Sequence, residues 1–465
     1  MTVLDALVLG AGVSGLAAAF DLARSGLHVA TLERANQPGG VVGTLELDGF
    51  RFETGPNTVQ ASSEAFRTLA HDLGIADRLV ASSGDAARYL WVRDRLVALP
   101  SSLPGFIGTP ILSFGGKLRI ATELFRPFQK PADGVEPTLR AFFSDRLGPE
   151  AATRLAGAFV RGVYAAELDE LGAESAFPRM WRACTEHGGM IRGVLALRKK
   201  PKPVLPGPQV KSSALLSFPN GLRELVDALA KAPGVDLMLG EEARTLARDG
   251  ELWKVTTANG LELRARHVVL ATPAPAAAAL LRSARLPAPC VEPLERVTHA
   301  DVTLVHLGFR TADVPSFPGG FGYLVPPDQV GPNAPRVLGT IFSSSLFEGR
   351  APAGAFGVTS FYRSSTAGAW SDADAAREAT ADLTRALRAR TAPKPVVSKV
   401  LRWSNVIPRY APGHMPRMAA LESELVRMAP NLHLAGSYAG GVSVEQVIAR
   451  GRAVAHRLRN GAQSS

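Results

Sequence analysis

The feature that most constrains this chain is a glycine-rich turn close to its N-terminus. A short apolar run over residues 6–9 leads into Gly10-Ala11-Gly12-Val13-Ser14-Gly15, and an apolar pattern of helical period follows over 16–23. A second apolar run starts at His28 and ends at Glu33. A strand, a turn, a helix and a second strand within about thirty residues form the unit that binds a dinucleotide.

The residues of this unit have separable roles. Gly10, Gly12 and Gly15 permit a tight turn and the close approach of a pyrophosphate, while the following helix N-terminus offers N–H groups and a positive dipole. Glu33 stands where a carboxylate accepts hydrogen bonds from an adenosine ribose. Its charge would repel a ribose phosphate, so NADP is not the expected ligand.

Length and cysteine content narrow the class of protein. A chain of 465 residues predicts two or three domains at about 100–200 residues each. Its two cysteines, Cys184 and Cys290, are too few and too far apart for a disulfide framework or a zinc site, so we predict no metal and a reducing compartment. Without a signal-peptide pattern or an apolar run of spanning length, we expect a cytoplasmic protein that contacts a membrane only peripherally.

The net charge of +10 is compatible with nucleic acid, anionic lipid or an acidic small molecule. The densest basic stretch, residues 198–202, lies among prolines without interleaved aromatic residues, which favours a solvated loop over a nucleic-acid surface. Residues 103–128 mix apolar side chains with Lys117, Arg119 and Arg126. That mixture fits either a helical layer with a buried face or an anionic membrane surface contact.

Motifs along the whole chain resemble the FAD-dependent amine oxidase and phytoene desaturase superfamily. They are residues 9–16, Glu33, Gly39-Gly40, the spaced set Gly49, Glu53 and Gly55, residues 268–273, and Leu434-Ala435-Gly436. Gln37 and Val41 depart from the usual pattern, because arginine is common at both positions. The resemblance therefore implies pyrophosphate contacts through backbone N–H groups and Arg34.

Within this superfamily the chain is most similar to the oxygen-dependent protoporphyrinogen oxidases. The motifs that carry this resemblance are residues 87–90, 96–100, 161–165, 320–326, 407–414 and 441–444. They imply FAD as cofactor, molecular oxygen as acceptor, and oxidation of protoporphyrinogen IX to protoporphyrin IX in haem biosynthesis. In that reaction flavin N5 takes the hydride and hydrogen peroxide is released.

The resemblance also implies a fold class and a division into domains. We expect an α/β protein with a discontinuous Rossmann-type FAD-binding domain over residues 1–87, 205–290 and 400–465. A mixed-sheet substrate-binding domain would occupy 291–399, and a helical membrane-facing insert 88–204. Strands are predicted over 235–239, 253–257 and 268–271, a further sheet over 302–309, 336–342 and 357–361, and a last helix over 444–459.

Site residues follow from the same resemblance. Arg88 would pair with a propionate, Phe321, Leu324 and Phe361 would enclose the macrocycle, and Gly162 and Gly322 would let backbone approach it. The residues expected around FAD are Gly10, Gly12, Val13, Ser14, Gly15, Glu33, Arg34, Gly39, Gly40, Val41, Gly55, Pro56, Asn57, Ala243, Trp403, Ser437, Val442, Ser443 and Val444. No catalytic residue is assigned, and His414 is expected to form a structural hydrogen bond.

Three alternatives stay open at this point. The first is a coproporphyrinogen III oxidase, which carries out the same chemistry on a macrocycle with more carboxylates and forms coproporphyrin III. The second, an amine oxidase, is disfavoured because residues 301–309 contain no lysine. The third is not an enzyme but a flavin-carrying or membrane-bound binding protein that passes tetrapyrroles to a partner. The oligomeric state is open, a homodimer included.

Overall fold

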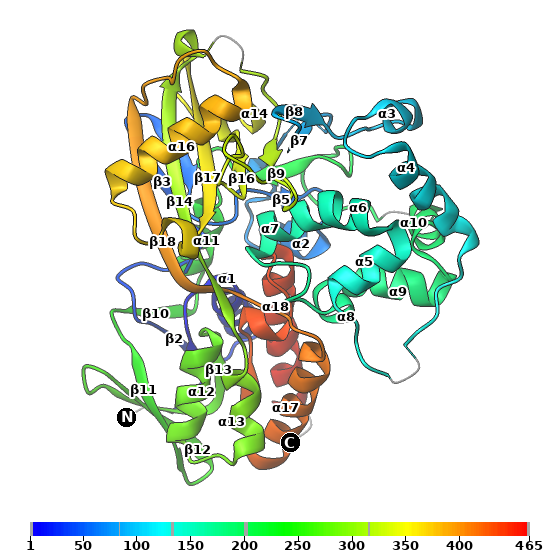
Figure 1. The fold of residues 1–465 in the computed structure, drawn as a ribbon. Coiled ribbons are helices and arrows are strands. Elements are labelled where there is room, and N and C mark those ends of the chain that lie inside the picture. Colours follow the sequence, from blue (N-terminus) through cyan, green and yellow to red (C-terminus); the bar gives the residue numbers. More distant parts are fainter. Residues whose placement is uncertain (1–2, 83, 132–133, 200–202, 315–316, 463–465) are drawn as a thin grey trace.

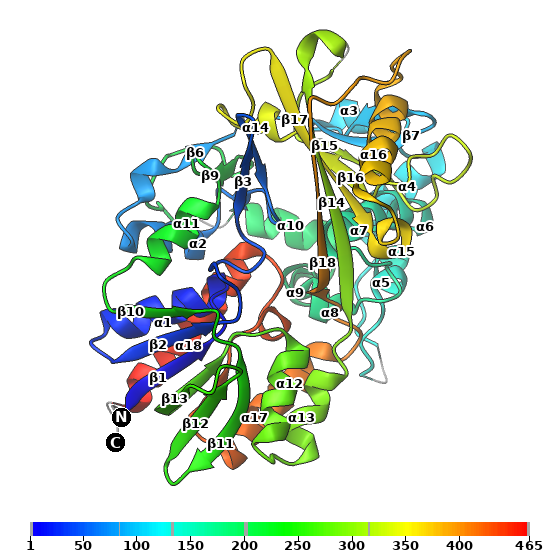
Figure 2. The same cartoon turned by 90° about the vertical axis from the view of Figure 1, so that its left-hand side faces the viewer.

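The computed structural model describes residues 3–82, 84–131, 134–199, 203–314 and 317–462. The chain forms two lobes, each built on a sheet, with a group of helices beside the second sheet (Figures 1 and 2). Both chain ends lie in the first lobe (Figure 1). Within the described residues, no helix is both long enough and apolar enough to span a bilayer.

The first sheet joins distant parts of the chain. Among the described residues its strands run in the order β10, β2, β1, β13, β12 and β11, with β19 also paired to β13. The pairs among β10, β2, β1, β13 and β19 are parallel, and β11 and β12 form an antiparallel edge. The bounds are β1 Leu4–Leu9, β2 Val29–Glu33, β10 Val235–Leu239, β11 Ala243–Asp249, β12 Leu252–Thr257, β13 Glu262–Leu270 and β19 Leu432–Leu434.

Helices cover both faces of this sheet, as the apolar strands require. Ala6 and Val8 of β1 pack with residues of α1 and α18. Leu7 and Leu9 point to the opposite face, towards α12, α13 and α17. The predicted Rossmann-type core and its strands are thereby confirmed. The helices of this lobe are α1 Val13–Arg24, α2 Glu64–Asp72, α11 Arg223–Ala230, α12 Ala274–Ser283, α13 Ala288–Glu295, α17 His414–Met428 and α18 Val444–Ala462.

The second sheet is mixed, and its described strands run in the order β18, β14, β17, β16, β15, β7 and β8. Helix α16 (Asp372–Leu387) packs on one face, with the short α14 (Ser343–Leu346) and α15 (Ser364–Ala367) nearby. The further sheet predicted from the sequence is confirmed. Its strands are β7 Arg88–Val92, β8 Arg95–Ala98, β14 His299–Arg310, β15 Gly322–Leu324, β16 Gly339–Ile341, β17 Ala355–Arg363 and β18 Val397–Pro408.

Two strands of this sheet come from segments that were predicted to belong, wholly or in part, to other domains. β7, which lies in the segment expected to be a helical insert, pairs in parallel with β15. β18 begins at Val397 and pairs with β14 along nearly its full length, although residues from 400 onward were expected in the first lobe. Backbone pairing between segments far apart in sequence sets these borders, and no local pattern reports it. The division into three domains stays a prediction.

Helices fill the segment between β8 and the return to the first lobe. They are α3 Leu103–Gly108, α4 Phe114–Ala121, η2 Thr122–Phe125, α5 Leu139–Leu147, α6 Pro149–Ala151, the π-helical η3 Ala152–Gly157, α7 Ala158–Tyr164, α8 Ala173–Ala176, α9 Pro178–His187 and α10 Met190–Lys199. Helix α10 runs into the basic stretch that was predicted to be a loop, and residues 200–202 of that stretch lie outside the described residues.

Of the two alternatives for residues 103–128, the buried helical face is found only in part. Neither α3 nor α4 contains a fully buried residue, but Phe106 and Ile120 are partly buried and pack with the cluster that includes Ile111 in the link between the helices. Leu103 is 72% exposed, Phe114 83% and, in η2, Phe125 79%. The exposed apolar side chains of α3, α4 and η2 therefore form an apolar surface.

Short strands complete the fold and connect the lobes. β3 (Thr44–Leu47) and β4 (Phe50–Glu53) form a hairpin, and β9 (Leu215–Ser217) pairs with β5 (Val59–Gln60) and β6 (Val80–Ala81). Phe50 and Phe52 of the hairpin pack with Val397 of the second sheet. The hairpin thus links the two lobes at the level of the candidate site. Short 3₁₀ turns lie at η1 Ala76–Arg78, η4 Thr311–Asp313 and η5 Ser437–Ala439.

Candidate cofactor and substrate site

The glycine-rich turn joins β1 to α1, and its three glycines meet different surroundings. Gly10 has a φ of +106°, and its N–H donates to the Leu32 carbonyl at 2.8 Å. A Cβ on Gly15 would lie 2.0 Å from the Gly10 carbonyl oxygen, so α1 can approach the turn only if this residue is glycine. A Cβ on Gly12, in contrast, would have no heavy atom within 4 Å.

This arrangement fits a dinucleotide. The first and third glycines are required by the turn itself, and the second leaves free space beside the start of α1. No side chain caps that helix start, so its N–H groups are available to an anion. Val13 and Ser14, both expected at the cofactor, form the first turn of the helix.

Glu33 holds the turn through backbone N–H groups. Its carboxylate accepts from Ala11 N–H at 2.8 Å and from Ala35 N–H at 3.0 Å. The backbone N–H of Glu241 donates to the Glu33 carbonyl at 2.9 Å, which places Ala243, at the start of β11, near this end of the site. Sequence reasoning assigned Glu33 to a ribose and missed its contacts with the turn. The ribose contact itself stays a prediction.

The second glycine pair lies directly against the first turn. Gly39 N–H donates to the Ala11 carbonyl at 2.8 Å, and a Cβ on Gly40 would lie 3.5 Å from the Gly12 Cα. Both glycines have positive φ, +112° and +60°. Arg34, the side chain expected to supply charge, is exposed.

A third segment of the site runs from Val41 to Asn57. The Val41 carbonyl accepts from Thr54 Oγ1 at 3.1 Å, and a Cβ on Gly55 would lie 2.4 Å from that carbonyl oxygen. Trp403 of β18 donates from Nε1 to the Thr54 carbonyl at 2.7 Å. Asn57 donates to the Gly55 carbonyl at 3.0 Å, and its buried Oδ1 has no hydrogen-bond partner in the chain. The turn that includes Pro56 thus lies beside a strand of the second lobe.

The C-terminal segment approaches the same region. Ser14 Oγ donates to the Ala435 carbonyl at 2.6 Å, which joins α1 to the end of β19. Ser437 lies in η5, where its carbonyl accepts from the Tyr410 hydroxyl. Residues 442–444 lead into α18, and Ser443 Oγ bonds Gln446 Oε1 at 2.9 Å. These residues were expected at FAD, and their direct contacts with it stay a prediction.

His414 has the structural role that its sequence context predicted. Its Nε2 lies 2.7 Å from the Tyr438 carbonyl, and its ring stacks on Tyr410 at 4.5 Å between centroids. Burial lowers its pKa. The two cysteines are buried free thiols, and the described residues contain no group of three or more side chains suited to a metal ion.

Four of the six expected substrate residues share one face of the second sheet, whereas Gly162 lies on α7 and Phe321 precedes β15 and packs against the cluster of Leu346. Residues paired across neighbouring strands point to the same face. Three rows of pairs therefore lie side by side on the face opposite α16. One is Arg88–Gly322–Ile341–Thr359, the next is Leu90–Leu324–Gly339–Phe361–Leu304–Leu401, and the last is Arg363–Val302–Trp403. We call this surface the central face.

The central face brings Arg88, Leu324 and Phe361 together with Trp403, the residue bonded to the turn at Gly55. Apolar packing supports the assignment, because Phe361, Leu304 and Trp403 belong to one cluster. The guanidinium carbon of Arg88 lies 5.6 Å from the centre of the Phe321 ring.

The two glycines expected at the macrocycle have another reason to be glycine. A Cβ on Gly162 would lie 2.5 Å from Leu324 Cδ2, and one on Gly322 would lie 2.1 Å from the Thr340 carbonyl oxygen. Gly322 also has a φ of +136°. The chain's own packing accounts for both residues, and a contact with substrate stays a prediction.

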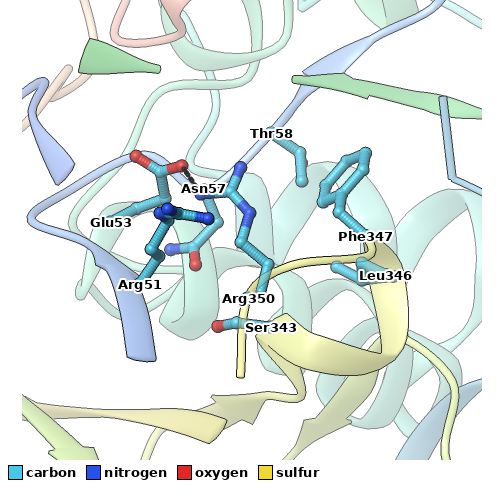
Figure 3. Close-up of a pocket in the computed structure, with 8 residues that line it drawn as sticks. All are labelled: Arg51, Glu53, Asn57, Thr58, Ser343, Leu346, Phe347 and Arg350. Carbon is cyan, nitrogen blue, oxygen red and sulfur yellow. Dashed lines mark ion pairs between the residues drawn. The ribbon is translucent and has the colours of Figure 1, made fainter. Parts of the chain in front are cut away.

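Sequence reasoning missed a buried ion pair that joins the lobes. Arg350 Nη1 lies 2.9 Å from Glu53 Oε1, and both side chains are almost fully buried (Figure 3). Glu53 also accepts from Thr44 Oγ1 at 2.9 Å and from Leu222 N–H at 3.1 Å, while Arg350 Nη2 donates to Ser217 Oγ at 2.8 Å. Glu53 was noted only as part of a motif, and no local signal identifies its distant partner.

A cavity of about 10 Å³ adjoins this pair, which is room for about one water molecule. Three further polar atoms that line it are buried without a hydrogen-bond partner in the chain: Asn57 Oδ1, Arg51 Nε and Ser343 Oγ. Figure 3 shows these side chains around the ion pair. Burial raises the pKa of Glu53 to about 7, against the opposing effect of Arg350.

Comparisons with known proteins identify related chains. The model of the flavin containing amine oxidoreductase family matches residues 13–459. A coproporphyrinogen III oxidase from Propionibacterium freudenreichii subsp. freudenreichii is 30% identical, over 96% of this chain and 89% of its own. Protoporphyrinogen oxidase 1, chloroplastic, from Spinacia oleracea is 31% identical, over 96% and 82%. A solved structure from Exiguobacterium sp. 255-15 matches with a TM-score of 0.82 at 21% identity, over 99% and 100% of the chains, which shows the shared fold.

The different surroundings of Gly12 and Gly15 predict different effects of an alanine at each position. Gly12→Ala should leave the free energy of unfolding of the apoprotein within about 0.5 kcal/mol of wild type, yet raise the dissociation constant for FAD at least about tenfold. Gly15→Ala should destabilise the apoprotein by about 1–3 kcal/mol, because its Cβ meets the Gly10 carbonyl. Urea unfolding and flavin fluorescence titration measure the two effects. Equal losses of apoprotein stability in both variants would contradict the assignment.

The buried ion pair generates a second prediction. Arg350→Met should cost about 3–5 kcal/mol of unfolding free energy at pH 8, because it leaves an unpaired buried carboxylate. The cost should be smaller at pH 6. Because the folded-state pKa of Glu53 lies above its ordinary 4.5, the folded protein keeps a proton there that the unfolded chain has lost. Arg377→Met, which breaks an exposed pair with Asp374, serves as control. Equal costs at the two pH values would refute the ionisation assigned to Glu53.

Proposed function

We propose, because the chain belongs to the flavin containing amine oxidoreductase family, that this FAD-dependent oxidoreductase oxidises a porphyrinogen to a porphyrin with molecular oxygen. The named relatives above act on protoporphyrinogen or coproporphyrinogen. A single propionate anchor at Arg88 favours protoporphyrinogen IX as the substrate, and coproporphyrinogen III is the alternative. FAD, when bound, supplies the hydride acceptor for such a reaction.

The central face carries this proposal. Arg88, an exposed cation, lies in the first row of this face, and Trp403, bonded to the turn at Gly55, lies in the last, with a row of apolar side chains between them. A flat macrocycle with a carboxylate edge could lie along this face. Leu324 and Phe361 would exclude water from it, and the Arg88 guanidinium would hold a propionate in its planar fork.

The residues of the central face need only bind and orient the substrate. Its paired rows are apolar or small apart from Arg88, Arg363, Thr359 and Trp403. Thr359 bonds His306 Nδ1 at 2.9 Å, but both side chains are fully buried and burial lowers the pKa of His306 to about 3, so this pair is not accessible to a substrate. His414 is engaged in its own hydrogen bond. We therefore assign the chain the tasks of positioning one carbon bridge, desolvating it and anchoring the propionate.

Arg88→Ala should raise the Michaelis constant for porphyrinogen about tenfold and lower kcat by less than about threefold, since the lost contact lies at the periphery of the substrate. Porphyrin fluorescence in air measures both constants. Arg310→Ala, which removes an exposed cation at the far end of β14, is the matched control. An unchanged Michaelis constant in the Arg88 variant would remove the propionate assignment.

We also propose that the exposed apolar surface of α3, α4 and η2 contacts an anionic membrane. Leu103, Ile107, Phe114, Leu118 and Phe125 are each more than half exposed, which is costly in water and favourable at a lipid interface. Arg119 and Arg126 already bond the Asp145 carbonyl oxygen, so the apolar side chains should contribute more than charge.

Vesicles that contain anionic lipid should co-sediment the purified holoenzyme at low salt, and a Phe114→Ser/Phe125→Ser variant should stay in the supernatant. Val426→Ser, an equally exposed apolar position on α17, should bind like wild type. Failure of the wild-type protein to sediment would eliminate the membrane proposal without affecting the oxidase proposal.

A further inference from the structure

A group of ionised side chains lies at the end of the central face opposite Arg88. Arg161 of α7 and Arg363 of β17 both contact Glu167 Oε1 at 2.9 Å. Arg409 lies 3.3 Å from Glu170, which itself accepts from Glu167 N–H at 2.6 Å. We call these five residues the arginine group. It contains three cations and two carboxylates, so it carries one positive charge in excess.

Two buried donors of this group lack an acceptor. Arg363 Nε and Arg409 Nε are buried and have no hydrogen-bond partner in the chain. Arg363 Nη2 is paired, because it lies 2.9 Å from Glu167 Oε1. Buried donors without an acceptor cost free energy. The Nε–H of Arg363 can therefore donate to a further carboxylate oxygen beside the one that Glu167 supplies.

The strand register places this group on the substrate surface. Arg363 follows Phe361 by two residues on β17, so both side chains belong to the central face. Val302 separates Arg363 from Trp403 in their row. Arg161 precedes Gly162, the residue whose Cα packs against Leu324. The register thus places Arg88 and Arg363 on one surface, and Arg161 is linked to Arg363 through the Glu167 oxygen that both contact.

Arg88 and Arg363 mark opposite corners of that surface. The row of Arg88 reaches β17 at Thr359, three strands away, and Arg363 lies four residues further along β17. With strands about 4.8 Å apart and about 3.3 Å of rise per residue, the two Cα atoms are about 20 Å apart. Long side chains reaching inward from both corners leave an apolar span between two cationic ends.

The substrates differ in how many edges carry charge. Protoporphyrinogen bears propionates on two neighbouring pyrrole rings, so its charge lies along one edge. Coproporphyrinogen bears a propionate on every ring, so opposite edges are charged. A surface with a cation only at Arg88 suits the first molecule, whereas cations at both ends suit the second.

We infer that Arg161 and Arg363 form a second carboxylate subsite, and that the substrate is a porphyrinogen with propionates at opposite edges, as in coproporphyrinogen. This inference rests on the proposed function and reverses the preference drawn from Arg88 alone. Glu167 acts as a positioning residue, because one of its oxygens holds both guanidinium groups in place.

The test compares wild type with Arg363→Gln and Arg161→Gln on both porphyrinogens. Each variant should raise the Michaelis constant for coproporphyrinogen about tenfold and change that for protoporphyrinogen less than about twofold, with kcat nearly constant. Arg402→Gln is the control, because Arg402 lies on the opposite face of β18 and pairs with Asp372. Should Arg363→Gln fail to fold, Arg161→Gln on a separate helix carries the test.

Binding of the product porphyrins to the holoenzyme, followed by quenching of protein fluorescence, separates the two claims. If wild type turns over but both variants raise the two Michaelis constants equally, the subsite is wrong and the oxidase proposal stands. If wild type oxidises neither porphyrinogen, yet the variants selectively weaken coproporphyrin III binding, the subsite stands and the oxidase proposal is wrong. Absence of both turnover and selective binding overturns both.

Discussion

The close approach of α1 and α18 to the glycine-rich turn is the contact on which the remaining structure depends. Gly15 lets α1 lie against the Gly10 carbonyl. Gly451 lets α18 lie against the Ser14 carbonyl of α1, because a Cβ at position 451 would be 2.1 Å from that oxygen. Ser14 then bonds Ala435 across 421 positions of sequence. The chain must therefore leave the first lobe and return to it, and the second sheet and its helices are inserted between segments of the nucleotide fold.

The second lobe is held to the first near the end of β4. Trp403 of β18 bonds Thr54, which follows β4, and Arg350, in the link between α14 and β17, pairs with Glu53 at the end of β4. A surface on the mixed sheet therefore ends against the turn expected to hold FAD. Substrate and cofactor can meet there without a dedicated catalytic side chain, because the fold supplies their proximity.

Local patterns predicted much of this structure. The turn at Gly10, most strands of the first sheet, three strands of the second and the last helix follow from apolar periodicity and glycine spacing, which act within a few residues. The exposure of Phe114 and Phe125 could not be read in the same way, because an apolar residue looks alike whether it faces a core or a surface. The placement of β7 in the mixed sheet likewise depends on a partner more than 200 residues away.

The site residues, too, were predictable where the signal is local and not where it depends on distant positions. Glycines fixed by their own turn were identified, whereas Glu53–Arg350 and Arg161–Glu167–Arg363 join positions distant in sequence and leave no local signal. Gly162 was predicted to contact the macrocycle, whereas the structure explains this glycine by its close packing against Leu324. Sequence therefore indicated the chemistry of the site, and the folded chain brought together the charges on which the proposed second carboxylate subsite rests.

The most direct test of the central claim is the reduction of enzyme-bound FAD by porphyrinogen in the absence of oxygen. Purified holoenzyme is mixed separately with protoporphyrinogen IX and coproporphyrinogen III, and flavin absorbance is followed before and after air is admitted. We predict loss of the oxidised flavin spectrum with formation of porphyrin, followed by recovery in air. A flavin that stays oxidised with both porphyrinogens would contradict the account.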